Sequence, residues 1–168
     1  MNEQGGISVT RVGRAGQEPA TDGLIELAEA ECWSRLETET LGRLTVVIAG
    51  EPHTFPVNFG VSGGATAFRT GPGTKLDRGA ANRASFEVDG YDPVAGTGWS
   101  VVARGVLLEI TGGLDTLSQE LQGLPVRPAA PGDRSSWMAV GPSQITGCLF
   151  RKDDPDRHGV VNSRRFWT

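Results

Sequence analysis

At 168 residues the chain fits one domain with a single core of ordinary size. Its net charge of −4 and pI near 5.2 argue against a nucleic-acid-binding protein, which normally has a basic face. No apolar run approaches the roughly 20 residues of a membrane helix, and the first residues lack a signal-peptide core, so we expect a soluble cytoplasmic protein.

Hydrophobic spacing predicts a mainly β chain with a few helices. Residues 1–22 are polar and are expected to form a flexible arm, and residues 152–168 form a charged tail. Apolar residues at steps of three and four predict helices over 24–39 and 114–123, and a third helix follows Thr74 to about residue 82. Strands are predicted over 42–50, 53–61, 65–70, 84–90, 99–111, 137–142 and 143–151.

The order of these elements favours a small antiparallel β-barrel with appended helices over a doubly wound fold, because no regular βαβ alternation appears. In the strand over 99–111, Val106 and Leu108 share one face with Val102 and Ile110. Gly105 lies in the middle of this strand, where glycine predicts a bulge or a close backbone approach.

Metal-binding spacing is missing from the sequence. The two cysteines, Cys32 and Cys148, are far apart and are expected to be reduced. His53 and His158 are the only histidines, and neither has a second ligand at metal spacing. We therefore predict no metal site.

One turn concentrates the groups that bind phosphate. In "AFRTGPGTKL" a strand ends at Arg69, the chain turns through Gly-Pro-Gly, and a helix is predicted to start at Thr74-Lys75. A helix N-terminus presents unpaired N–H groups and partial positive charge, and flanking cations complete an anion seat. The alternative is a solvated polar turn in which Thr74 only caps the helix.

Three stretches, "GRLTVVIAGEPHTFPVNFGV", "AFRTGPGTKLDRGAANRASFEVDGYDP" and "GTGWSVVARGVLLEIT", together resemble the pyridoxamine 5′-phosphate oxidase-like family of flavin-binding split-barrel proteins. The "ECW" helix and "GPSQITG" are similar to the same family, so the resemblance spans about 28–151. It implies a split-barrel flavin-binding domain over 23–151 that forms a homodimer, with FMN held between the subunits.

The resemblance also assigns the cofactor-binding residues. Arg69 and Lys75 would hold the phosphate, with a hydrogen bond from Thr74, and Asn58 would face the edge of the ring. The complete set is Asn58, Phe68, Arg69, Thr70, Thr74, Lys75, Trp99 and Ser100.

Phe68 and Thr70 would lie beside the isoalloxazine, mainly through backbone groups, and Trp99 and Ser100 would reach the cofactor from the partner subunit. Asn58 and Trp99, like the turn, have structural alternatives. Asn58 would then satisfy a backbone group at a strand edge, and Trp99 would be a core or interface aromatic.

The C-terminal tail departs from the family. It reads "DDPDRHGVVNSRRFWT" and does not reproduce the Arg-x-His-Asp-Arg-type segment of true pyridoxamine-phosphate oxidases, which argues against vitamin B6 oxidation.

The resemblance implies an FMN-dependent oxidoreductase that transfers a hydride or electrons to a small organic substrate. Two alternatives stay open. One is a reductase that uses 8-hydroxy-5-deazaflavin, whose longer acidic tail would be bound by Arg78 and Arg83. The other is a non-catalytic flavin-binding protein.

Overall fold

The computed structural model describes residues 24–72, 82–112 and 115–151. The predicted arm, the predicted C-terminal tail and almost all of the helix predicted after Thr74 lie outside these residues. The described part contains the elements β1 (Leu24–Glu26), α1 (Glu29–Glu37), β2 (Leu41–Ile48), β3 (Glu51–Ser62), β4 (Ala65–Thr70), β5 (Arg83–Asp92), β6 (Thr97–Ile110), α2 (Thr116–Gln122) and β7 (Ser136–Arg151).

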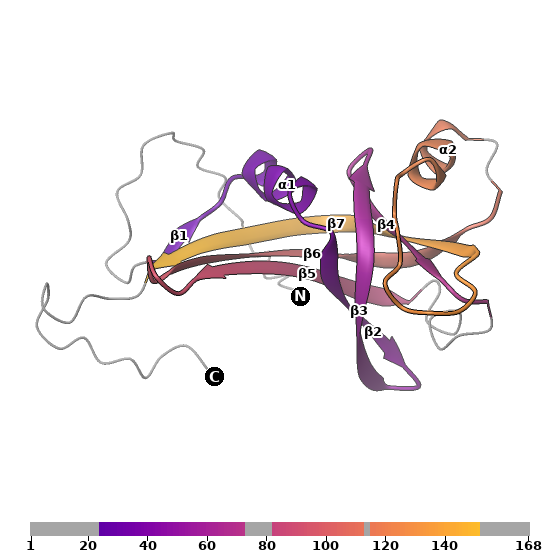
Figure 1. The fold of residues 1–168 in the computed structure, drawn as a ribbon, viewed down its shortest axis with the longest axis horizontal. Coiled ribbons are helices and arrows are strands. Elements are labelled where there is room, and N and C mark those ends of the chain that lie inside the picture. The colour runs from indigo at the N-terminus through magenta and orange to yellow at the C-terminus, as the bar shows by residue number, and fades with distance from the viewer. Residues whose placement is uncertain (1–23, 73–81, 113–114, 152–168) are drawn as a thin grey trace, which may run out of the picture.

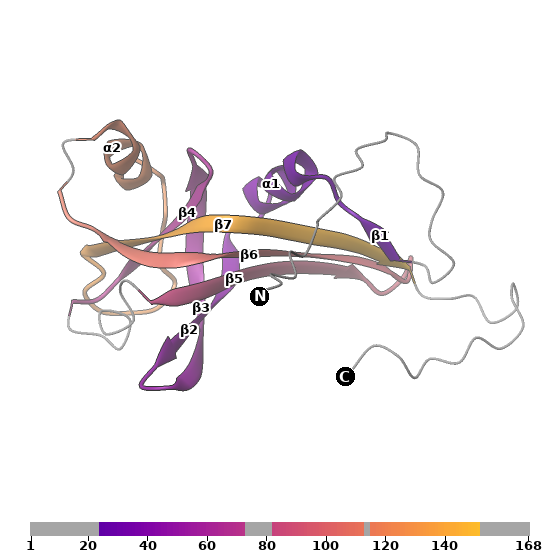
Figure 2. The ribbon, with the colours of Figure 1, turned by 180° about the vertical axis from the view of Figure 1, so that it is seen from behind.

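The strands form one antiparallel sheet in the order β1-β7-β4-β3-β2-β5-β6. β6 also pairs with β7, so strands β2 to β7 close into a barrel and β1 is added along one edge of β7. Long strands β5, β6 and β7 run side by side, β2 and β3 cross them steeply, and both helices lie on the same side (Figures 1 and 2). This architecture confirms the predicted mainly β split barrel.

The C-terminal part of the sheet is one strand of 16 residues, although the sequence predicted two strands there. β7 stays continuous because a bulge absorbs one residue: Arg104 of β6 pairs with Gln144, whereas Gly105 pairs with Pro142. A Cβ at Gly105 would collide with the carbonyl of Gly141. The bulge and the close approach predicted at Gly105 are both confirmed.

The N-terminal segment also differs from the prediction, because residues 24–26 form β1 instead of the first turn of a helix. Ile25 pairs with Leu149 of β7, and this tertiary pairing outweighs the helical spacing of the side chains. The helix begins only at Glu29. The length of the predicted helix was therefore wrong, but its C-terminal part was placed correctly.

Helix α1 fills the gap between β1 and β4 along β7. β4 pairs with β7 only as far as Val140, and β1 begins to pair at Cys148. Cys32 and Leu36 of α1 are completely buried over this gap. Gly147 allows the close approach, since a Cβ there would lie 2.8 Å from the Cys32 sulfur.

Helix α2 covers the outer side of β4 and packs Leu121 against a small cluster that contains Ala65, Ala67 and Ala139. Its N-cap is Asp115, whose carboxylate accepts a hydrogen bond from the Ser118 N–H at 2.8 Å. This hydrogen bond lowers the pKa of Asp115 below its ordinary value. In the described residues neither helix has the length and hydrophobicity needed to cross a bilayer.

The main core lies inside the barrel, where Phe59 meets Phe86 edge-to-face at a centroid distance of 4.8 Å. On β6 the inward positions include Val101, Ala103 and Leu107, which are fully buried. The apolar face predicted on this strand is the outer face, and Val106 and Leu108 are 38% and 49% exposed.

Candidate binding cleft

A cleft of about 370 Å³ opens where β3 and β4 separate. The β3–β4 ladder runs from Ser62–Ala65 to Phe59–Phe68 and then stops, so the next residues of each strand line opposite walls. The loop between α2 and β7 closes the third side. Apolar walls come from Leu41, Phe55, Pro56, Val57, Pro128, Ala129 and Ala130, and polar groups come from Asn58, Arg69, Thr70 and Arg134.

Arg69 is half-buried at the end of β4, and two contacts fix its guanidinium. Nε donates a hydrogen bond to the carbonyl oxygen of Arg134 at 2.8 Å. Cζ lies 5.7 Å from the centroid of the Trp137 ring, on the neighbouring strand. No other hydrogen bond from this guanidinium is seen in the part of the chain that the structure describes.

Asn58 lies on the opposite wall and joins three segments of the chain. Its Oδ1 accepts a hydrogen bond from the Ala129 N–H at 2.7 Å, and its Nδ2 donates to the Thr40 carbonyl at 3.2 Å. The amide thus satisfies backbone groups, which is the role that the structural alternative assigns to it. Contact between Asn58 and a flavin ring stays a prediction.

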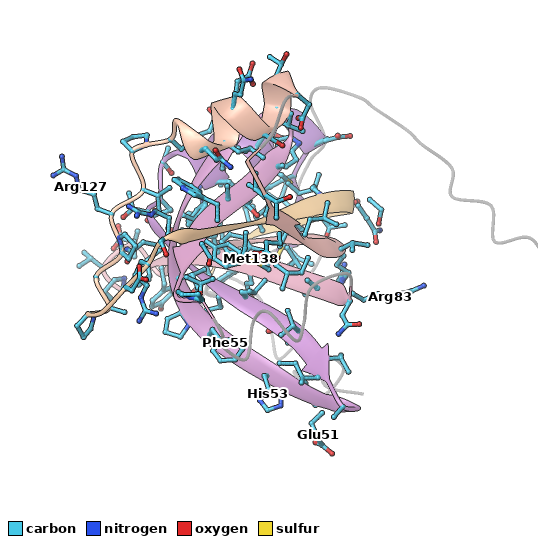
Figure 3. All side chains as sticks on the ribbon, turned by 90° about the vertical axis from the view of Figure 1, so that its right-hand side faces the viewer. Glu51, His53, Phe55, Arg83, Arg127 and Met138 are labelled. Atoms are coloured by element: carbon cyan, nitrogen blue, oxygen red, sulfur yellow. The ribbon has the colours of Figure 1, made fainter. Side chains whose placement is uncertain are left out.

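Thr70 lines the cleft, whereas Phe68 does not. Phe68 is completely buried, pairs with Met138 of β7 and packs in the barrel core (Figure 3 labels Met138). Only the backbone of Phe68 is left for a contact with a ligand. The backbone contacts expected of Phe68 and Thr70 are compatible with this placement and stay predictions.

Trp99 and Ser100 lie near the start of β6 and do not line the cleft of their own chain. The guanidinium of Arg35 lies 5.0 Å above the Trp99 ring, which packs against the main core. Ser100 Oγ lies 3.5 Å from the sulfur of Cys148. Their expected contact with the cofactor of a partner subunit stays a prediction.

Thr74 and Lys75 lie outside the described residues.

The structure adds Arg134 to the site, a residue that sequence reasoning missed. Arg134 belongs to the proline-rich loop before β7, is half-buried, and donates a hydrogen bond from Nη2 to the Pro131 carbonyl at 3.1 Å. Arg127 belongs to the same loop but extends away from the molecule (Figure 3). Nothing in the spacing of the loop distinguishes these two arginines, since only packing decides which one faces β4.

A second hollow, of about 430 Å³, lies over the outer faces of β2, β5 and β6. Arg83 and Arg104 line it, but the Arg83 side chain points away from the molecule (Figure 3). This hollow contains none of the residues assigned to FMN. The cleft contains Asn58, Arg69 and Thr70, and we take it as the candidate site for that reason.

The described lining of the cleft is apolar apart from its amide, hydroxyl and guanidinium groups. Among its described lining residues there is no His, Cys, Asp or Glu. The described residues also contain no group of three or more such side chains that could hold a metal ion. The arrangement can hold a flat apolar group between its walls and an anion at its two arginines.

The fold and the cleft define a split-barrel protein in which two arginines line a mainly apolar cleft. The family model described as pyridoxamine 5′-phosphate oxidase matches residues 28–148. The chain belongs to this family.

Solved structures are similar over most of the chain. An FAD binding protein from Mycobacterium smegmatis is 36% identical, with a TM-score of 0.64 over 76% of this chain and 98% of the other. A putative pyridoxamine 5′-phosphate oxidase from Corynebacterium glutamicum is 32% identical, with a TM-score of 0.65 over 77% and 99%. An FAD-binding protein from Mesorhizobium loti, at 22% identity and a TM-score of 0.59 over 75% and 97%, shares the fold. None of the curated proteins matches this chain.

Proposed function

We propose that this protein binds a flavin nucleotide in the cleft between β3, β4 and the loop before β7. The observation that supports this most directly is Arg69, which is half-buried, oriented by two contacts and without an acidic partner in the described residues. A fixed cation that faces a cleft without a counter-ion suits the phosphate of a flavin nucleotide.

The shape and chemistry of the cleft fit such a ligand. Flavins have a flat ring and a phosphate-bearing tail, and the cleft has mainly apolar walls with its polar groups gathered at few positions. FMN is the cofactor that the sequence resemblance implies. FAD is the second candidate, because the similar proteins from M. smegmatis and M. loti are FAD-binding proteins.

The proposed activity is that of a flavin-dependent oxidoreductase. A bound flavin supplies hydride or electron transfer, while the chain supplies grip, orientation and exclusion of water. Arg69 would hold the tail, and Phe55 and Val57 would form part of an apolar wall. Since no described residue of the cleft can exchange a proton near neutral pH, a non-catalytic flavin-binding protein is the second candidate function. The deazaflavin alternative gains no support from Arg83, which does not line the cleft.

We also propose that the protein is a homodimer with the site at the subunit interface. The outer face of β6 exposes Val106 and Leu108, and Val47 of β2, which lines the same outer hollow as Val106, is 46% exposed. A row of exposed apolar side chains on a barrel is stabilised when a second copy covers it. Light scattering at micromolar concentration should give twice the chain mass of 17.8 kDa, and a clean monomer would contradict this proposal.

Titration of the purified protein with FMN and with FAD tests the proposed function. Both flavin absorbance and flavin fluorescence should change on binding, and Arg69→Ala should weaken binding by about 10- to 100-fold, because a charge-assisted hydrogen bond contributes about 1.5–3 kcal/mol. Arg127→Ala is the matched control and should leave the affinity unchanged. A protein that binds neither nucleotide, or an Arg69→Ala variant that binds as well as wild type, would contradict the proposal.

A further inference from the structure

We propose that Arg134 is a second anion-binding residue, and that Arg69 and Arg134 together form a two-arginine seat for a phosphate or diphosphate group. The inference rests on the proposed site. The loop before β7 then takes a direct part in ligand binding. The expected ligand carries a phosphate or diphosphate group, because guanidinium groups bind such oxyanions.

The two arginines reach the same cleft from separate parts of the chain. Arg69 lies near the end of β4, and Arg134 lies near the end of the loop that leads into β7. The hydrogen bond from Arg69 Nε goes to the backbone carbonyl of Arg134, so the two residues are in direct contact. Each guanidinium is oriented by a single hydrogen bond to a carbonyl, and each therefore keeps further N–H donors for a ligand.

Both side chains are half-buried, and neither has an acidic partner among the residues that the structure describes. In the described residues the one ion pair is Arg43–Asp89, on the outer face of the sheet. Asp133 is next to Arg134 in sequence, but it does not line the cleft, and its carboxylate accepts a hydrogen bond from the Ser135 N–H at 2.9 Å. Two cations that share a partly desolvated hollow repel each other, and an anion bound between them removes that repulsion.

The loop that presents Arg134 is attached to both walls of the cleft. Arg69 binds its carbonyl at residue 134, and Asn58 binds its N–H at residue 129. Val126, on the α2 side of this loop, is buried and lies close to Gly60 of β3. Because the loop is held at both ends, the Arg134 guanidinium is positioned before a ligand arrives, which lowers the entropic cost of binding.

The ligand group expected between the two arginines is a phosphate oxyanion. It can belong to the tail of the flavin nucleotide or to a free phosphorylated compound.

The test compares wild type, Arg134→Gln, Arg134→Lys and the matched control Arg127→Gln. The probes are FMN, FAD, riboflavin (which lacks phosphate), and inorganic phosphate and pyrophosphate alone, all measured by calorimetry. The substitution keeps the backbone carbonyl at residue 134, so the hydrogen bond from Arg69 is retained and only the guanidinium is lost.

For Arg134→Gln we expect affinity for the phosphate-bearing probes to fall about 10-fold or more, with riboflavin affinity unchanged. Arg134→Lys should recover most of the affinity, because it restores the charge. A purely structural role through the hydrogen bond to Pro131 would instead weaken riboflavin and phosphate probes alike. Arg127→Gln should match wild type with every probe.

The outcomes separate this inference from the proposed function. A loss confined to FMN and FAD supports the inference and identifies the cofactor tail as the anion. A loss seen with pyrophosphate, in a protein that binds no flavin, supports the inference and contradicts the proposed function. If Arg134→Gln and Arg127→Gln bind every probe equally well, or if riboflavin binding falls as much as FMN binding, the inference is overturned.

Discussion

The two halves of β7 show how one strand serves a sealed core and an open site. Its C-terminal half lies under α1, where Cys32 and Leu36 are completely buried and Gly147 leaves no space for a side chain. Burial, with a smaller contribution from the carboxylate of Glu31, raises the pKa of the Cys32 thiol above its ordinary value. The N-terminal half of β7 pairs with β4 beside the cleft, where Arg69 lies against Trp137.

The difference comes from what covers the neighbouring strands. Where β4 and β1 leave part of β7 unpaired, an amphipathic helix fills the gap with apolar side chains. Where β3 and β4 separate, a proline-rich loop spans the opening and attaches to side chains of both strands. A helix excludes solvent because its backbone hydrogen bonds are internal, whereas a loop leaves polar groups that face the opening. The sealed region should therefore govern stability, and the cleft should govern binding.

The largest effect should come from Phe68→Ala. Phe68 is fully buried in the barrel core, and loss of its ring should lower the free energy of unfolding by about 3–5 kcal/mol. Urea denaturation measures this change. Phe68→Leu is the control and should lose less. The folded fraction of either variant should keep its affinity for flavin, because the Phe68 side chain faces away from the cleft. A large loss of affinity in a fully folded variant would show that core and cleft are not independent.

A smaller effect is expected from Gly147→Ala, which tests the sealed half alone. The new Cβ would lie 2.8 Å from the Cys32 sulfur and 3.0 Å from the Ser100 carbonyl oxygen. Such overpacking should lower the free energy of unfolding by about 1–3 kcal/mol. Gly112→Ala is the matched control, since a Cβ there has no neighbour within 4 Å. Equal stability of the two variants in urea would show that α1 can shift away from β7 at little cost.

Asn58→Ala tests the cleft half, and it should change stability no more than Gly147→Ala does. It removes the hydrogen bonds to the Ala129 N–H and the Thr40 carbonyl, at about 0.5–1.5 kcal/mol for each. The freed loop should weaken the binding of FMN and pyrophosphate more than it weakens the fold. Thr54→Ala is the control on the same strand, because it removes a hydrogen bond to Thr45 that does not involve the loop. If both variants bind FMN equally, the attachment of the loop has no role in binding.

The sequence was sufficient for most of the fold because its signals are local. Alternating apolar residues identified the strands, a mid-strand glycine identified the bulge at Gly105, and the ordered motifs identified the family. The errors lie where tertiary contacts outweigh local preference. Residues 24–26 pair with β7 instead of continuing α1, and the bulge carries β7 through Pro142 without a break. The alternation of β6 was correct, but it did not show which face is inside.

The candidate site divides in the same way. By itself the sequence determined that Arg69 stands at the end of a strand, beside a Gly-Pro-Gly turn, because that depends on residue order and turn chemistry; phosphate binding there stays a prediction. Only the tertiary structure decided that Asn58 attaches the loop, that the Phe68 side chain belongs to the core, and that Arg134 rather than Arg127 faces the cleft. Those choices depend on which distant segments meet where β3 and β4 separate, and contacts between distant segments arise from packing rather than from the spacing of residues along the chain.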